Sequence, residues 1–239
     1  MLVGSIQEIT RHPVKSFAGE RVKKTKVMDY GLYGDRSHAF KDKQGKFITI
    51  TQVPEMVRYQ AFFSGEENLN AYPELKVKTP KGNLLTWGEE GFREEMALLL
   101  KREAEAVVYP PSHIPFGAIE EENILLVSDA SIGELTKLWG NEADGRRFRH
   151  NLVLSLVDKI PFLEERWFGK RLVIGNDVEL EIKRHCERCM IITVDPVDSH
   201  KDPSLLKTVV KERNNHFGVY ASVVRTGEIR LGDPVFLTD

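Results

Sequence analysis

The sequence has few cysteines, no long apolar run and almost no net charge, and each of these shortages excludes a class of protein. Only two cysteines occur in 239 residues, too few for a disulfide scaffold or an iron–sulfur cluster. The longest apolar stretches, such as residues 124–127 and 190–192, are far shorter than the roughly 20 residues that cross a bilayer. We therefore expect no contact with a membrane.

The charges nearly cancel, with 34 Lys and Arg against 36 Asp and Glu, so no overall positive field favours a nucleic acid polymer. Residues 1–10 lack a basic segment followed by an apolar one, which predicts a cytoplasmic protein. A reducing compartment disfavours a disulfide between Cys186 and Cys189. The glycine-rich fingerprint of a dinucleotide-binding βαβ unit is also missing, so the chain itself is not expected to dock a nicotinamide or flavin.

Short apolar segments punctuated by Gly and Pro predict an α+β, predominantly β fold. The pattern 91–105 predicts a helix, and Ser128 and Gly140 are typical of the two ends of a second helix. Three prolines in residues 109–115 oppose regular structure, so we place a domain boundary there, between residues 1–108 and 109–239. The expected strands are residues 3–10, 22–28, 38–41, 47–51, 75–78, 83–87, 124–127, 151–156, 178–183, 190–195, 219–225 and 228–237, the last interrupted at Gly232.

The two cysteines enclose two charged residues in Cys186-Glu-Arg-Cys189, on an expected loop between strands. A thioredoxin-type pair would instead open a helix after a strand. A structural zinc site would need further ligands from His185, His200 or His216. Two buried, inert thiols remain an alternative. Because Arg188 adjoins a cysteine, its charge favours the thiolate that soft metals require.

Basic residues occupy positions that suit an anion. Lys15 and Arg36 follow turn-forming residues, where backbone donors are also available, and a cluster of arginines ending in Arg149 precedes Asn151. Each of these alone is typical of a solvated surface charge. An anion site would require the fold to bring them together.

The chain as a whole resembles MOSC proteins. Residues 1 to about 105 are similar to the N-terminal β-barrel module of that family, and residues from about 110 to 239 are similar to the MOSC domain itself. The first resemblance rests on Arg11-His-Pro-Val-Lys-Ser16, Gly31-Leu-Tyr-Gly-Asp-Arg36 and Phe47-Ile-Thr49. The second rests on Arg147-Phe-Arg-His-Asn151, Cys186-Glu-Arg-Cys-Met-Ile-Ile-Thr-Val-Asp-Pro196, Phe217-Gly-Val-Tyr220 and Gly227-Glu-Ile-Arg-Leu-Gly-Asp-Pro234. It implies a β-barrel-like module followed by a MOSC β-barrel domain with a few helices.

The resemblance also implies a set of site residues. It makes Cys189 the molybdenum ligand and catalytic residue, while Cys186 matches a position that does not bind the metal. The residues implied to hold molybdopterin and its phosphate are Lys15, Ser16, Arg36, Arg149, Asn151, Arg188 and Tyr220. These residue types suit a phosphate, because Arg pairs with it bidentately and the others add a charge or neutral hydrogen bonds.

The implied activity is that of amidoxime-reducing components and of bacterial MOSC proteins that detoxify N-hydroxylated bases. A molybdenum cofactor would support reduction of a small N-hydroxylated substrate from N–OH to N–H. Because no second redox group is expected in the chain, an external electron-transfer protein must supply the electrons. The alternatives are a molybdopterin or sulfur carrier without substrate turnover, and a β-rich binding module without a cofactor.

Overall fold

The structure, a computed structural model, describes residues 1–119 and 121–238. Its α-helices are α1 (Glu90–Leu100), α2 (Asp129–Trp139) and α3 (Ser204–Arg213), and its short 3-10 helices are η1 (Pro54–Arg58), η2 (Gly145–Phe148), η3 (Leu163–Trp167) and η4 (Met190–Thr193). The strands are β1 (Leu2–Arg11), β2 (Glu20–Arg21), β3 (Lys24–Met28), β4 (Gly31–Leu32), β5 (His38–Lys41), β6 (Gln60–Ser64), β7 (Glu74–Lys78), β8 (Leu84–Thr86), β9 (Glu105–Val108), β10 (Ile124–Ser128), β11 (Leu152–Leu156), β12 (Arg171–Ile174), β13 (Val178–Glu187), β14 (His216–Arg225), β15 (Gly227–Arg230) and β16 (Pro234–Thr238).

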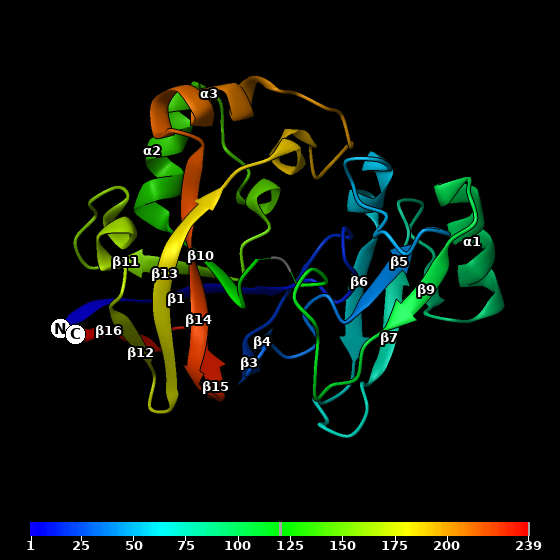
Figure 1. The fold of residues 1–239 in the computed structure, drawn as a ribbon, viewed down its shortest axis with the longest axis horizontal. Coiled ribbons are helices and arrows are strands. Elements are labelled where there is room, and N and C mark those ends of the chain that lie inside the picture. The colour runs from blue at the N-terminus through cyan, green and yellow to red at the C-terminus, as the bar shows by residue number, and fades with distance from the viewer. Residues whose placement is uncertain (120, 239) are drawn as a thin grey trace.

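A closed barrel forms the larger of two lobes (Figure 1). Within the part of the chain that the structure describes, seven strands close it in the order β11, β10, β14, β13, β12, β16 and β1, and β1 pairs back with β11. All neighbours are antiparallel except β10 and β11, which are parallel. Buried aliphatic side chains such as Ile6, Leu126 and Leu180 fill the interior. Closure leaves these strands without a free edge, which removes a surface for aggregation.

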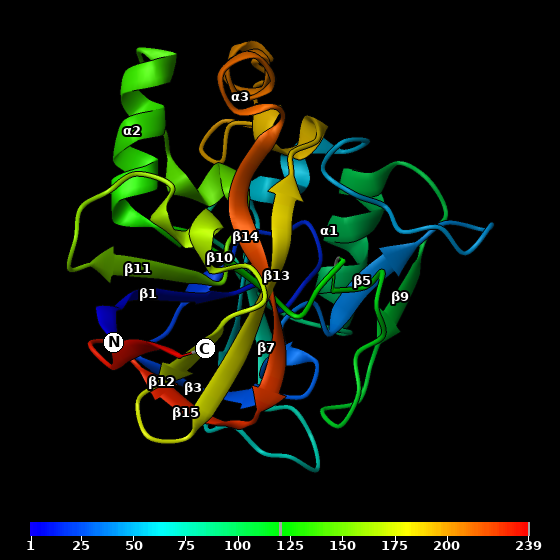
Figure 2. The same ribbon diagram turned by 60° about the vertical axis from the view of Figure 1, so that its left-hand side comes forward.

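The smaller lobe, residues 38–108, combines the β5–β9 pair, the β6–β7–β8 sheet and helix α1. Its core mixes aliphatic side chains with aromatic ones such as Phe40, Phe63 and Phe92, and Phe17 packs into it from the loop after β1. The chain leaves the barrel after β1, builds this lobe, and returns to the barrel at β10, as both ribbon views show (Figures 1 and 2). The two lobes are thus joined by two crossings of the chain, and residues from both can meet between them.

Helices α2 and α3 cover one end of the barrel (Figure 2). The predicted ends of α2 are confirmed: the Ser128 hydroxyl accepts a hydrogen bond from Ser131 N at 3.1 Å, and Gly140 adopts a φ of 77°. Helix α1 ends earlier than predicted, because Lys101 takes the left-handed conformation and residues 105–108 pair with β5 as β9.

Two predicted strands are wrong. Residues 47–51 form only an isolated bridge at Phe47, and the following backbone folds into a turn. Residues 190–193 form η4, and Val194 follows it, because the apolar side chains serve two cores rather than one sheet. Ile192 packs beneath α2 and α3, and Val194 packs into the smaller lobe. The remaining predicted strands are found within a few residues of their bounds, whereas β2, β4, β6, β9, β12 and α3 were not predicted.

The fold class is confirmed as α+β and predominantly β. The division at residue 108 stays a prediction, and the structure places β1 from the first segment in the barrel with strands from the second. Among residues 1–119 and 121–238, no helix is long and apolar enough to cross a membrane.

Candidate functional site

The two cysteines lie in different environments. Cys186 belongs to β13, which continues past the expected strand end, and it is 2% exposed beside Leu125 and Tyr220. Cys189 precedes η4 and is exposed. The sequence placed both on one loop, which is wrong for Cys186. Only Cys189 is therefore accessible to a ligand arriving from solvent.

Arg188 lies between the cysteines and contacts the buried one. Its Nη1 donates to Cys186 Sγ at 2.7 Å, and its Nη2 donates to the carbonyl of Phe148 at 2.9 Å. Its buried Nε has no hydrogen-bond partner among the residues that the structure describes. The Arg188 guanidinium therefore contacts Cys186, the buried cysteine. Its Nε is the donor that could still bind a ligand.

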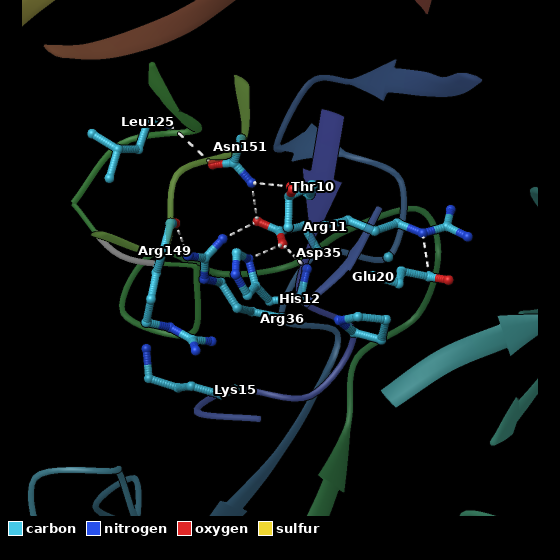
Figure 3. Close-up of polar contacts among 12 residues, drawn as sticks. Thr10, Arg11, His12, Lys15, Glu20, Asp35, Arg36, Leu125, Arg149 and Asn151 are labelled. Atoms are coloured by element: carbon cyan, nitrogen blue, oxygen red, sulfur yellow. Dashed lines mark hydrogen bonds and ion pairs between the residues drawn. The ribbon is translucent and has the colours of Figure 1, made fainter. Parts of the chain in front are cut away.

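A buried carboxylate, Asp35, organises the neighbouring part of the site (Figure 3). It accepts hydrogen bonds from the backbone N of His12 at 2.6 Å and from Asn151 Nδ2 at 3.0 Å, and it also pairs with Arg36 Nη1. Arg36 Nη2 in turn donates to the carbonyl of Arg149 at 3.1 Å. The network thus joins the loop after β1, the turn after β4 and the segment between η2 and β11.

The charges in this network set its protonation. Burial alone would raise the pKa of Asp35, but the Arg36 guanidinium and the contacts with His12 outweigh it and hold that pKa well below its usual range. Burial lowers the pKa of His12 to about 3, and the charges of Arg149 and Arg36 act in the same direction. At neutral pH the site therefore contains an ionised Asp35 and a neutral His12.

Three of the predicted residues have unusual backbone geometry. Ser16, Arg36 and Arg149 adopt positive φ angles of 74°, 57° and 55°, in the left-handed region that side chains with a Cβ disfavour. Backbone strain of this kind is known to gather at functional sites. Its occurrence in three separate segments that meet here supports a binding role for the region.

The structure brings most of the predicted residues to one cavity. Six of them line it, together with Cys186, Leu125 and Phe148: Arg36, Arg149, Asn151, Arg188, Cys189 and Tyr220. Its volume is about 50 Å³. A wider cleft of about 880 Å³ shares Arg149 with it but does not include Cys189. We assign the site to the narrow cavity because the exposed thiol of Cys189 lines it.

Lys15 and Ser16 lie in the adjoining loop. Lys15 Nζ donates to the carbonyl of Ala118 at 2.9 Å, and Arg149 Nη1 donates to the carbonyl of Phe17 at 2.9 Å. The side chains of Lys15 and Arg149 point toward the same side of the network (Figure 3). The Ser16 hydroxyl accepts from the backbone N of Ile50 at 3.2 Å. The cations predicted separately from the sequence therefore gather in space.

Asn151 makes its contacts within the protein. Its Nδ2 donates to Asp35 and to the carbonyl of Thr10 at 3.3 Å, and its Oδ1 accepts from the backbone N of Leu125 at 3.0 Å. A direct contact with a cofactor stays a prediction. The geometry indicates that Asn151 positions its neighbours.

Two buried residues of this region, Asp35 and His12, were not singled out from the sequence. Both stand inside motifs that carry the family resemblance, next to Arg36 and before Lys15, and this adjacency was the only available signal. His150 is also buried, and its Nε2 lies 3.1 Å from Glu8 Oε1. Burial tends to raise the pKa of Glu8, but its contacts with His150, Thr10 and Arg21 lower it to about 2.

A zinc site would need further His, Cys, Asp or Glu ligands beside the cysteines. Among the described residues, no group of three or more His, Cys, Asp and Glu side chains is arranged to hold a metal ion. The rings of His185 and His216 stack on each other at 4.3 Å.

Comparison with known families agrees with this geometry. The MOSC domain matches residues 111–236, and the MOSC N-terminal beta barrel domain matches residues 3–91. The chain belongs to the MOSC family. A solved structure of the YuaD protein from Bacillus subtilis shares the fold of this MOSC chain, with a TM-score of 0.54, 14% identity, and coverage of 98% of this chain and 95% of that one.

Curated relatives of the MOSC chain include redox proteins. Mitochondrial amidoxime-reducing component 1 of Homo sapiens is 27% identical over 98% of this chain and 83% of its own length. Mitochondrial amidoxime reducing component 2 of Rattus norvegicus is 25% identical with the same coverage. Molybdenum cofactor sulfurase of Caenorhabditis elegans is 36% identical, but over only 43% of this chain and 14% of its own length. Of these names, that of the sulfurase mentions the molybdenum cofactor, and the other two mention amidoxime reduction.

Proposed function

We propose that this MOSC protein is a molybdenum-cofactor-dependent reductase of small N-hydroxylated compounds that takes its electrons from a separate protein. The observation that carries the proposal is an exposed thiol, Cys189, on the rim of a cavity whose walls contain several buried guanidinium groups. Full-length similarity to amidoxime-reducing components supports the substrate class.

The side chains fit an anionic cofactor that carries a soft metal. Cys189 would provide the thiolate ligand, since soft metals prefer sulfur. Arg36, Arg149 and Arg188 would pair with a phosphate, and the buried Nε of Arg188 is a donor without a partner among the described residues. Lys15, Ser16 and Tyr220 would add hydrogen bonds. The cavity is far smaller than a typical ligand pocket of roughly 300–1,000 Å³, so it would enclose only part of a pterin cofactor.

The bound cofactor would supply the two-electron chemistry of the reduction. Overall, the N–O bond breaks, an N–H bond forms, and two electrons and two protons are consumed as water is released. The protein contributes binding, orientation and electrostatics. Exposure of Cys189 keeps the metal position within reach of both a small substrate and an electron-donor protein.

A second candidate is a molybdopterin or sulfur carrier without turnover. The partial similarity to molybdenum cofactor sulfurase favours it, as does the exposed cysteine, which could equally hold a transferable sulfur. The same guanidinium groups would serve a carrier. The two candidates differ only in whether a substrate is reduced.

The test is an anaerobic assay of purified, molybdenum-loaded protein. Reduced viologen with a benzamidoxime or an N-hydroxylated purine should give the N–H product, whereas NADH as the sole reductant should not. Cys189→Ser should lose both bound molybdenum and turnover, with Cys186→Ser as the matched control. Turnover with NADH alone would refute the requirement for an electron partner. Full molybdenum occupancy without viologen-driven turnover would favour the carrier.

A further inference from the structure

Asp35 is a buried carboxylate at the junction of the two lobes, and its contacts reach three distant segments. Its partner Asn151 is 116 residues away in the sequence, and its partner Arg36 contacts the carbonyl of Arg149 across 113 residues. Asp35 itself is 1% exposed. It therefore lies beneath the cavity rather than on its surface, and it does not line the cavity wall.

The contacts of Asp35 account for the placement of the cationic side chains. Its Oδ2 receives both Arg36 Nη1 and Asn151 Nδ2, and its Oδ1 receives the backbone N of His12. With one guanidinium edge held by Asp35, Arg36 uses Nη2 to fix the carbonyl of Arg149. Both arginines have positive φ angles, so each is held in a backbone conformation that it does not prefer. Removing the carboxylate would release this arrangement.

We propose that Asp35 is a positioning residue that presets the anion pocket by holding Arg36, and through it Arg149, in the arrangement that receives a phosphate. The inference rests on the proposed function only in assigning the pocket to an anionic cofactor. A negative charge near an anion site should by itself oppose anion binding. If Asp35 acts by positioning, removing its charge should weaken phosphate binding. If it acts only through its charge, the same change should strengthen phosphate binding, so the two roles can be distinguished by experiment.

The experiment measures binding of inorganic phosphate to the full chain by calorimetry. Asp35→Asn keeps the size of the side chain but removes its charge. If Asp35 positions Arg36, this variant should bind phosphate about tenfold more weakly, the loss expected for a charge-assisted hydrogen bond that is no longer made. Tighter binding would show that only the charge mattered and would overturn the proposal. Glu134→Gln is the matched control, because it removes one negative charge from an exposed pair on α2 and should change nothing.

A double-mutant cycle separates positioning from general loss of structure. In an Arg36→Ala background the carboxylate no longer has this guanidinium to hold, so Asp35→Asn should weaken phosphate binding no further. Equal tenfold losses in both backgrounds would overturn the proposal. Circular dichroism would give the folded fraction of each variant, so that affinities refer to folded protein, and molybdenum and pterin content after expression should follow the same order.

These outcomes are independent of the reductase assay. The chain could give the expected phosphate affinities in the Asp35→Asn and Arg36→Ala cycle and yet reduce no N-hydroxylated compound. That result would refute the proposed function and would still support the role of Asp35. A wild-type chain that binds no phosphate would overturn the anion pocket and the role of Asp35 with it.

Discussion

The positive φ of Arg149 allows its backbone and its guanidinium to be tested separately. Arg149→Ala and Arg149→Gly both remove the guanidinium, but only glycine adopts a φ of 55° without strain. The left-handed conformation costs an alanine about 1–2 kcal/mol. Glycine loses about 0.5–1 kcal/mol through the greater freedom of its unfolded chain. The glycine variant should therefore be more stable than the alanine variant by about 1 kcal/mol.

For a chain of this length, about 1 kcal/mol corresponds to a rise in Tm of roughly 2–4 °C. Thermal and urea unfolding of the cofactor-free protein would measure it. Both variants lose the bond from Arg149 Nη1 to the carbonyl of Phe17, so that loss cancels in the comparison. Both should also bind the cofactor more weakly, by about 1.5–3 kcal/mol, because the charge-assisted contact is gone.

A matched pair at Lys101 provides the control. This residue caps α1 with a φ of 52° and lies outside the candidate site, so glycine should again be more stable than alanine while cofactor content stays unchanged. The reasoning is refuted if the glycine variant is more stable than the alanine variant at position 101 but not at position 149. If Arg149→Gly keeps its full molybdenum content, the guanidinium does not belong to the site.

Three further predictions concern the cysteines, pH and packing. Cys189→Ser should abolish molybdenum retention, whereas Cys186→Ser should spare it because serine can still accept from the Arg188 guanidinium; equal loss in metal analysis of both variants would contradict this. Burial lowers the pKa of His38 to about 3 in the folded state, whereas in the unfolded chain His38 takes up a proton below pH about 6.5. The free energy of unfolding should therefore fall as the pH drops from about 6.5 towards 3, by up to about 1.4 kcal/mol per pH unit. Urea unfolding at pH 7 and pH 5 should show a smaller loss in His38→Gln, and an unchanged slope would refute the assignment. Gly218→Ala should cost more than about 2 kcal/mol, because φ is +81° and a Cβ would lie 2.9 Å from Val127 Cγ1; an unchanged Tm would show that the backbone adapts.

Local patterns in the sequence were sufficient to predict much of the fold. Short apolar segments located β1, β7, β10 and β14, and the cap residues Ser128 and Gly140 located both ends of α2. These signals are local, because strand period and cap chemistry depend on neighbours a few residues apart. The same signals failed at residues 190–195, where an apolar run is divided between two cores.

The motifs also determined which residues to consider for the site, though not how they interact. Residue types suited to a phosphate and a soft metal could be identified along the chain, and six of them line one cavity. Only the tertiary structure decided that Arg188 contacts Cys186, that Cys189 is exposed, and that Asp35 holds Arg36 and Asn151. These contacts join segments up to 116 residues apart, and burial of one carboxylate among them depends on how the two lobes meet. Short-range sequence patterns carry no information about contacts between such distant segments. The lowered pKa of Asp35 and the positive φ angles of Arg36 and Arg149 therefore depend on the tertiary fold, in which β1 pairs with β11 to close the barrel.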